Sequence, residues 1–276
     1  MPDSTTTLSF IGCGKLGQTL GRLWAERSFF EIRQVLNRTL GSAQSAVDFI
    51  SSGQAIDSFS RLQPADIFLI GTPENAIEDT AQKLAGCSLR SGTIVFHCSG
   101  ALPSTALKIL SGQGALIASV HPIKSFADAQ EALSSFPGTW CGMEGDRLAL
   151  DALRSAFEAI DGRPVEINTK DKLIYHAAAV FASNYLVTLL DAALQAYMKA
   201  GIPEAIAREM LVPLVTGTVE NVSRLGSEKA LTGPIARGDQ DTVMRQYKAL
   251  GTWSRQNARL YKLMGLHTAR LAKRRS

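Results

Sequence analysis

The fold of this chain is decided by the stretch Leu8-Ser9-Phe10-Ile11-Gly12-Cys13-Gly14-Lys15-Leu16-Gly17. Its first four residues form a mostly apolar, β-prone run, and three glycines with the spacing G-x-G-x-x-G follow it. A helical pattern begins at once, because Leu16, Leu20 and Leu23 recur at intervals of about one helical turn. The stretch therefore predicts a buried strand, a tight turn and a helix.

Each glycine of this turn has a separate physical role. Gly12 permits a sharp turn, Gly14 presents no Cβ to a pyrophosphate, and Gly17 lets the helix approach the strand. The free N–H groups and the positive dipole end of the helix then face the phosphates. We therefore predict a dinucleotide site at Gly12, Gly14, Lys15, Leu16 and Gly17. An ordinary strand–helix turn is the structural alternative.

The residues after the second expected strand, 31–36, bear on the choice of cofactor. NAD sites place an Asp or Glu about 20 residues after the glycines, where it holds the ribose 2′-hydroxyl. This chain has Asn37, Arg38 and Thr39 instead. A guanidinium pairs with a 2′-phosphate in a fork, whereas a carboxylate repels it. These three residues predict a preference for NADP(H), and a surface turn is the alternative.

The next expected elements are a helix over 41–53 and a buried parallel strand over 65–70, which leads to Thr72 and Pro73. Parallel sheets bind ligands at the carboxyl ends of their strands, so Thr72 and Pro73 are candidate cofactor contacts. An N-cap at Thr72 with Pro73 in the first helical position is an equally good structural explanation.

Two further strands end in polar residues at the same edge of the sheet. The strand 93–96 leads to His97 and Ser99, and the strand 116–120 leads to His121. A histidine in such a place can orient or protonate the partner atom of a reacting carbon. It can also donate its ring N–H to a loop carbonyl. We favour this structural role for His97, and for His121 both roles remain open.

Strands and helices alternate as far as a short strand over 139–142 and a helix over 147–160. This alternation is typical of a doubly wound parallel sheet, so the predicted fold class is α/β. Helical periodicity dominates afterwards. We predict an NADP-binding Rossmann domain over 1–163 and an all-helical substrate and dimerisation domain over 164–276.

One long helix is expected over 170–200, where alanine is abundant and glycine is nearly absent. Lys172 and His176 fall on one stripe of this helix, Asn184 lies beside it, and the other faces are apolar. Such a helix should be buried nearly all round, and a buried lysine and histidine need partners. They belong either to a structural network or to a substrate site over the nicotinamide.

Composition excludes several classes of protein. A charged content of 20% and a net charge of +4 are ordinary, and the basic cluster between residues 255 and 275 has no nucleic-acid motif beside it. The apolar run 177–190 falls short of the roughly 18 clean residues that a membrane span needs. The polar N-terminus and four scattered cysteines predict a cytoplasmic protein, and we expect no metal site.

A series of short motifs runs along nearly the whole chain, and its last member is the most specific. Together these motifs resemble the NADP-dependent oxidoreductases that join a Rossmann-like domain to DUF2520, a helical domain of unknown function. The resemblance implies NADP(H)-dependent hydride transfer. The motifs are Gly12-Cys13-Gly14-Lys15-Leu16-Gly17, Asn37-Arg38-Thr39, Thr72-Pro73, His97-Cys98-Ser99-Gly100, His121-Pro122, Ser125-Phe126, Tyr175-His176-Ala177-Ala178 and Leu231-Thr232-Gly233-Pro234-Ile235-Ala236-Arg237-Gly238-Asp239.

This family is similar in turn to 6-phosphogluconate and β-hydroxyacid dehydrogenases and to pyrroline-5-carboxylate reductase. The resemblance implies a C-terminal domain of the 6-phosphogluconate dehydrogenase type, and a homodimer formed through it. Hydroxyacid dehydrogenases carry a Lys and an Asn about one turn later; Lys172 matches, but His176 occupies the next turn. His121-Pro122 resembles the His-Pro of prephenate and arogenate dehydrogenases, where a Ser near position 99 assists.

The predicted function is NADP(H)-dependent hydride transfer to or from a small carbonyl, alcohol, imine or amine compound bound between the domains. Lys172 or His176 supplies the proton, while His121, Ser99 and Asn184 position the reacting group. A prephenate- or arogenate-type dehydrogenase is the alternative substrate class. A non-catalytic NADP-binding sensor or a dimeric assembly protein is the alternative from a different class.

Overall fold

The computed structural model describes residues 5–274 and divides the chain into two compact units, one ending at Val180 and one beginning at Phe181. This division lies beyond the predicted boundary at residue 163, because the start of the helix at Lys172 packs within the first unit. Residues 1–4 and 275–276, and with them Arg275 of the basic cluster, lie outside the described residues.

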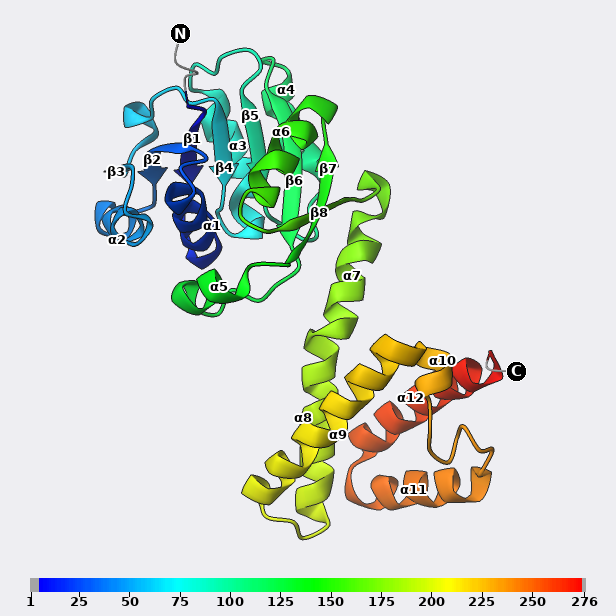
Figure 1. The fold of residues 1–276 in the computed structure, drawn as a ribbon. Coiled ribbons are helices and arrows are strands. Elements are labelled where there is room, and N and C mark those ends of the chain that lie inside the picture. The colour runs from blue at the N-terminus through cyan, green and yellow to red at the C-terminus, as the bar shows by residue number, and fades with distance from the viewer. Residues whose placement is uncertain (1–4, 275–276) are drawn as a thin grey trace. The chain divides into compact units, whose positions relative to one another are not determined.

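The first unit is built on one eight-stranded sheet, whose strand order is β3-β2-β1-β4-β5-β6-β7-β8 (Figure 1). Strands β1 to β6 are mutually parallel. The predicted α/β class with an N-terminal Rossmann-like sheet is therefore confirmed. The strands are β1 (Thr7–Ile11), β2 (Glu31–Leu36), β3 (Gln54–Ile56), β4 (Ile67–Ile70), β5 (Ile94–His97), β6 (Leu116–Pro122), β7 (Trp140–Gly145) and β8 (Arg163–Glu166).

The far side of the sheet departs from the prediction of a wholly parallel sheet. Strand β7 runs antiparallel to β6, and β8 runs parallel to β7. The link from β6 to β7 carries α5 (Ala129–Ser135) and is hydrogen-bonded to the start of the first helix by Lys15 and Thr19. Strand β7 therefore begins beside the carboxyl end of β6 and runs in the opposite direction. The sequence reasoning missed β3 and β8, which are short edge strands.

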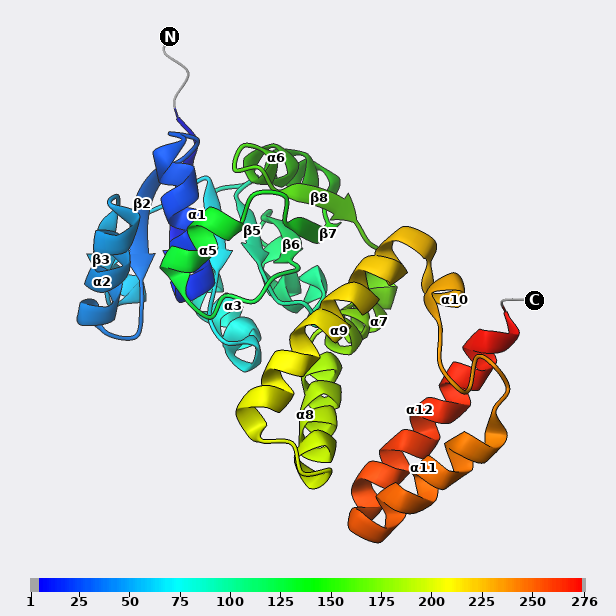
Figure 2. The ribbon, with the colours of Figure 1, turned by 60° about the horizontal axis from the view of Figure 1, so that its bottom comes forward.

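Helices cover both faces of the sheet (Figure 2). Successive side chains of the strands alternate between the two faces. On β4, Ile67 and Leu69 join one core cluster, whereas Phe68 and Ile70 join the other. The first cluster includes residues of α1 (Lys15–Glu26), α2 (Leu40–Ile50) and α6 (Arg147–Glu158), and the second includes residues of α3 (Ile77–Ala85) and α4 (Lys108–Ser111).

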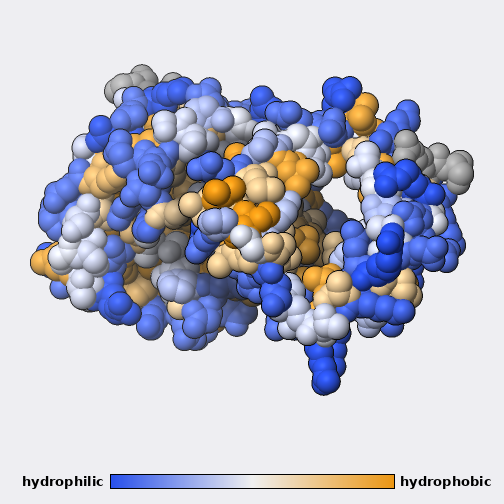
Figure 3. All heavy atoms as spheres, turned by 90° about the horizontal axis from the view of Figure 1, so that it is seen from below, coloured by the Kyte–Doolittle hydropathy of each residue, from blue (hydrophilic) through white to orange (hydrophobic). Residues whose placement is uncertain are grey.

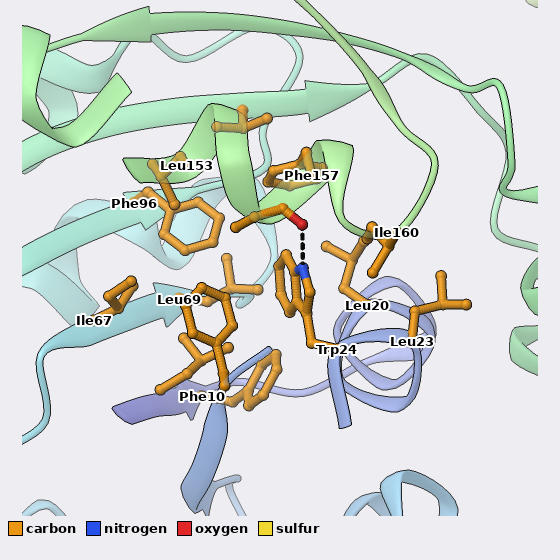
Figure 4. Close-up of a cluster of buried hydrophobic side chains, with 14 of the residues drawn as sticks. Phe10, Leu20, Leu23, Trp24, Ile67, Leu69, Phe96, Leu153, Phe157 and Ile160 are labelled. Carbon is orange, nitrogen blue, oxygen red and sulfur yellow. Dashed lines mark hydrogen bonds between the residues drawn. The ribbon is translucent and has the colours of Figure 1, made fainter. Parts of the chain in front are cut away.

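Trp24 on α1 stands at the centre of the first cluster (Figure 4). Its ring lies edge-on to Phe30 and Phe157, with centroids 5.3 and 5.4 Å away. The indole Nε1–H donates to the Ala156 carbonyl at 2.7 Å, so the polar atom of this buried side chain is satisfied. These contacts join α1 to α6 and fix the direction in which the N-terminus of α1 points.

The predicted helix over 170–200 is interrupted at Ser183, where the backbone leaves helical geometry. Its first part is α7 (Lys172–Ala182), which follows a single 3₁₀ turn, η4 (Thr169–Asp171). The second unit contains the rest of the helical elements, which are α8 (Asn184–Lys199), α9 (Glu204–Leu225), α10 (Ser227–Ala230), α11 (Gln240–Trp253) and α12 (Arg255–Lys273).

The expectation that this long helix is buried nearly all round is wrong for the described chain. Lys172 is the only buried residue of α7, and α8 has none. Phe181 and Val187 expose 68% and 66% of their surface, and Figure 3 shows apolar patches open between hydrophilic residues. The neighbouring helices of this single chain cover only part of the apolar surface that the sequence provides.

The segment Thr169–Lys199 is long and apolar enough to cross a membrane, judged by length and composition alone. This differs from the prediction drawn from residues 177–190. The segment nevertheless begins inside the first unit, since Lys172 is buried there beside Glu144.

Candidate functional site

The glycine loop has the backbone geometry that its sequence predicts. Gly12 has a φ of +81°, and a Cβ built there would lie 2.7 Å from the backbone nitrogen of Thr72. A Cβ on Gly71 would lie 2.3 Å from the carbonyl oxygen of Gly12, so the ends of β1 and β4 approach closely. A Cβ on Gly17 would lie 3.1 Å from the sulfur of Cys13, which fits its predicted role in helix–strand packing.

The N-terminus of α1 is open to an anion. Gly14 is its N-cap, a Cβ there would meet nothing within 4 Å, and the first turn contains no acidic residue. A cavity of about 370 Å³ adjoins this point and is lined by Leu16, Thr72 and Ser99 among others. The Lys15 side chain is exposed and donates to the Ala127 carbonyl. These residues fit a pyrophosphate-bearing cofactor.

Of the three residues predicted to select the cofactor, two are used within the fold. The Asn37 side chain accepts from the Cys13 N–H at 2.7 Å and donates to the Ser42 carbonyl at 3.0 Å, so it braces the glycine loop. Thr39 is the N-cap of α2. Arg38 is exposed, and its side chain has no ion-pair or hydrogen-bond partner among residues 5–274. Its guanidinium remains available for a phosphate.

The Thr72-Pro73 turn does not have the capping arrangement considered above. Pro73, not Thr72, is the N-cap of a 3₁₀ turn, η2 (Glu74–Ala76), and the Thr72 hydroxyl lies 3.4 Å from that of Thr80. Glu74, which the sequence reasoning missed, accepts a hydrogen bond from the Ser99 hydroxyl. Ser99 therefore lies at the cofactor cavity, with its side chain held by a carboxylate.

His97 has the structural role that we favoured. It is fully buried, its Nε2 lies 3.2 Å from the Pro103 carbonyl, and its Nδ1 accepts from the Ser99 N–H at 3.1 Å. These two bonds assign the proton to Nε2. Burial, and after it the charge of Lys172, lower the pKa of His97 to about 4. The ring is therefore neutral and serves to hold the loop.

His121 and His176 both lie against Gly100, and Tyr175, which precedes His176 in the chain, contacts His121. The His121 Nδ1 lies 3.0 Å from the Tyr175 hydroxyl, and the two imidazole centroids lie 5.8 Å apart. A Cβ on Gly100 would lie 2.4 Å from the His176 Nδ1 and 2.9 Å from the His121 ring. Gly142 is equally restricted, since a Cβ there would lie 2.4 Å from the Tyr175 oxygen.

The electrostatics of this cluster, which we call the His121–Tyr175–His176 cluster, favour neutral side chains for two of its members. Burial lowers the pKa of His121 to about 4, and the charges of His176 and Lys172 act in the same direction. Burial raises the pKa of Tyr175 to about 12. At neutral pH the cluster thus offers a neutral imidazole and a protonated phenol.

The buried Nδ1 of His176 has no hydrogen-bond partner within residues 5–274. A buried polar atom left without a partner costs about 1–3 kcal/mol, so such an atom indicates a position that a ligand or a water molecule completes. Tyr175 was missed as a site residue although it precedes His176 in a quoted motif, because its partner His121 is remote in the sequence.

Lys172 is buried in an ion pair. Only 1% of it is exposed, and its Nζ donates to Glu144 Oε1 at 3.0 Å and to the Ser119 hydroxyl. Of the two alternatives for Lys172, these contacts favour the structural network. Glu144 was missed, although an acidic residue in an apolar strand signals a buried partner.

Asn184 is placed differently from the other predicted catalytic residues. It begins α8 in the second unit and is exposed, so its predicted role stays a prediction. Ser99, His121, Lys172 and His176 all belong to the first unit. Within residues 5–274, no group of three His, Cys, Asp or Glu side chains is placed to hold a metal ion.

Two family models match successive parts of the chain. The model of a Rossmann-like domain matches residues 3–122, and that of DUF2520, a domain of unknown function, matches residues 139–268. The chain therefore contains a Rossmann-like domain and a DUF2520 domain in succession. The resemblance drawn from its motifs is confirmed.

Solved structures share this fold over nearly the whole length of the chain. A protein of Thermotoga maritima is 25% identical, with a TM-score of 0.78 over 97% of this chain and 98% of that one. A putative NADP oxidoreductase of Bacteroides fragilis is 20% identical, with a TM-score of 0.75 over 96% and 98%. An imine reductase from a Pseudomonas species is 16% identical, with a TM-score of 0.65 over 98% and 99%. No curated protein matches the chain.

Proposed function

We propose that this protein is an NADP(H)-dependent oxidoreductase that interconverts a small carbonyl or imine compound with the corresponding alcohol or amine. The observation that carries the proposal is the unpartnered Nδ1 of His176, which lies beside His121 in the unit that holds the glycine loop. The fold is shared with a protein named as an NADP oxidoreductase and with an imine reductase, which supports the same class.

The cofactor would be held by residues of the first unit. The N–H groups at the start of α1 and the open backbone at Gly12 and Gly14 would bind the pyrophosphate, and Arg38 would pair with the 2′-phosphate. NADPH, when bound, supplies a hydride to the substrate carbon. The cavity that adjoins the loop is lined by Ser99 and Thr72, which supports substrate binding at this edge of the sheet.

Reduction of a C=N or C=O bond also requires one proton at the nitrogen or oxygen. We assign its delivery to His176, since its Nδ1 has no partner within the described chain. His121 and Tyr175 would orient the reacting atom by hydrogen bonds, because one is a neutral imidazole and the other a protonated phenol at neutral pH. In the oxidative direction, His176 would accept the proton.

The helical domain would form a homodimer. Val187 on α8, together with Leu214 and Val219 on α9, exposes more than half of its surface, and a second copy of the chain would cover these apolar faces. We propose a cytoplasmic protein that binds a small-molecule substrate and a second copy of itself, with neither nucleic acid nor a membrane as a partner.

The test measures the consumption of NADPH with a panel of small aldehydes, ketones and cyclic imines. The absorbance of the reduced nicotinamide reports the rate. His176→Gln should lower kcat on the active substrate by about 100-fold, the usual effect of losing a placed acid. His267→Gln, which changes an exposed histidine of α12, is the control and should leave kcat unchanged. Full turnover by His176→Gln would refute the assignment. Tight NADPH binding without turnover on any compound would favour the non-catalytic sensor.

A further inference from the structure

We propose that Lys172 and Glu144 form a buried cluster that positions His176 against His121, and that Lys172 itself transfers no proton. This inference rests on the proposed function, because it assigns a positioning residue for the same site. It assigns delivery of the proton to the imidazole of His176, although the amine of Lys172 is also a natural candidate for the acid.

The Lys172–Glu144 cluster joins five elements of the first unit. Lys172 is the first residue of α7 and Glu144 lies on β7, and their partners Ser119, Ser104 and Thr169 lie on β6, η3 (Ser104–Leu107) and η4. Glu144 Oε1 accepts from the Ser104 N–H at 2.7 Å and from Lys172 at 3.0 Å. Glu144 Oε2 accepts from the Ser104 hydroxyl at 2.7 Å and from Thr169 at 3.0 Å.

The carboxylate is therefore saturated, since four donors occupy the four acceptor positions that an ionised carboxylate offers. Its exposed fraction is 2%, and that of Lys172 is 1%. A buried ion pair is stabilised by further hydrogen bonds to its members, and here four donors satisfy the Glu144 carboxylate while Lys172 also donates to Ser119. The burial of Glu144 would raise its pKa, but the hydrogen bonds from Ser104 and the charge of Lys172 lower it, so the carboxylate stays ionised.

This environment is unsuited to an acid that must exchange protons in every turnover. A general acid has to reach within about 3 Å of the substrate atom, directly or through one water molecule. The ammonium of Lys172 points instead toward Glu144 and Ser119 and is closed off from solvent. Protonated lysine is here the partner that a buried carboxylate requires.

The Lys172–Glu144 cluster holds in place two segments that border the His121–Tyr175–His176 cluster. On one side, Tyr175 and His176 follow Lys172 by three and four residues, which places all three on the same face of α7. On the other side, the Ser119 hydroxyl lies 3.4 Å from the Ser99 carbonyl. Ser99 precedes Gly100, the residue against which His176 packs. Loss of the ion pair should thus move His176 relative to His121.

The deciding experiment compares Lys172→Met, Glu144→Gln and the double variant in the full-length protein. Each single change leaves a buried group without its charged partner, whereas the double variant replaces the pair with neutral side chains of similar size. With NADPH and 1-pyrroline, a small cyclic imine, as the probe, we expect each single variant to lose about 100-fold in kcat. The double variant should recover to within about fivefold of the wild type.

Recovery in the double variant is the readout that a catalytic amine cannot give, because that variant has no amine at position 172. A double variant as slow as Lys172→Met, with a native spectrum, would overturn the proposal and make Lys172 the acid. If a single variant does not fold, the double variant decides the question by itself.

A second readout does not depend on turnover. The chain has four histidines, so ¹³C-labelled imidazole resonances can be assigned by substitution. We expect Lys172→Met to shift the resonances of His121 and His176 and to leave that of His267 unchanged, with partial return in the double variant. Unchanged resonances of His121 and His176 in Lys172→Met would refute the positioning role. If the wild type reduces no probe, the proposed function fails while these spectra still decide on the cluster.

Discussion

The two units of this protein use apolar residues in opposite ways. In the first unit, both faces of the sheet are covered by helices, and large side chains such as Trp24, Phe96 and Phe157 are fully buried. In the second unit, Ala207 and Ala258 are the only buried apolar residues among those described. The first unit thus contains its own core, whereas the second presents apolar helix faces that its own chain leaves uncovered.

This difference shows that an apolar pattern predicts burial without identifying what covers it. Helix α8 is more apolar on average than α6, yet α6 packs on the sheet while α8 stays largely open. Stability should therefore depend on internal packing in the first unit and on association in the second. Four experiments test this contrast.

The largest effect is expected at the centre of the first core. Trp24→Ala removes a fully buried indole and the hydrogen bond to Ala156, and should lower the free energy of unfolding by about 3–5 kcal/mol. Urea unfolding followed by circular dichroism measures this loss. Trp253→Ala, at a half-buried position of the second unit, should cost less than half as much. Equal losses would show that the helical unit has a core of its own.

The next prediction concerns the pH dependence of stability and compares the buried His97 of the first unit with the exposed His267 of the second. The pKa of His97 is about 4 in the fold and 6.5 in the unfolded chain, because burial disfavours the charged ring. Between these values the unfolded state binds more protons, so His97 stabilises the fold above pH 6.5 and this stabilisation is lost as the pH falls toward 4. The full difference is about 3 kcal/mol.

In His97→Gln, the loss of unfolding free energy between pH 6.5 and pH 4 should therefore be smaller by about 3 kcal/mol. Urea titrations at a series of pH values measure it. His267→Gln alters an exposed histidine of α12 and should keep the wild-type dependence. An unchanged slope in His97→Gln would contradict the burial of a neutral ring.

Association can be tested with two matched substitutions. Val187 on α8 and Leu148 on α6 expose 66% and 68% of their surface. Val187→Glu should weaken the homodimer by about 2 kcal/mol, or roughly 30-fold in the dissociation constant, whereas Leu148→Glu should leave it unchanged. Sedimentation equilibrium measures both. A wild-type protein that sediments as a monomer would remove the explanation offered for the open helices.

The smallest effect concerns the cofactor and should be confined to the first unit. Arg38→Asp removes the guanidinium proposed to bind the 2′-phosphate and adds a repelling charge, so the dissociation constant for NADPH should rise about tenfold. The affinity for NADH should stay constant or increase. Calorimetric titration with both cofactors measures this, and equal weakening of the two would refute the assignment of Arg38.

Local sequence was sufficient for most elements of the first unit. The strand 31–36 was predicted with the bounds that the structure has, and the positive φ of Gly12 agrees with the sharp turn predicted there. The direction of β7 was not predictable, because it depends on how the link after β6 packs beside α1, more than a hundred residues earlier.

For the candidate site, the sequence singled out residues without separating their roles. Lys172 and His176 were selected as polar residues on an apolar helix, and in the structure both contact groups of the sheet. Their roles could not be separated, since the deciding partners, Glu144 and His121, are distant in the sequence. Arg38 and Asn37 were likewise grouped together, although Asn37 braces the glycine loop and Arg38 does not.

The sequence by itself determined what neighbouring residues dictate: a glycine turn before a helix, the alternation of strands and helices, and a helical second half. The tertiary structure alone decided that Lys172 is paired with Glu144, that Tyr175 reaches His121, and that the Nδ1 of His176 has no hydrogen-bond partner within residues 5–274. The physical reason is that backbone conformation follows from short-range sterics and hydrogen bonds. The charge state and exposure of a side chain, in contrast, depend on partners that only the folded chain brings within a few ångströms.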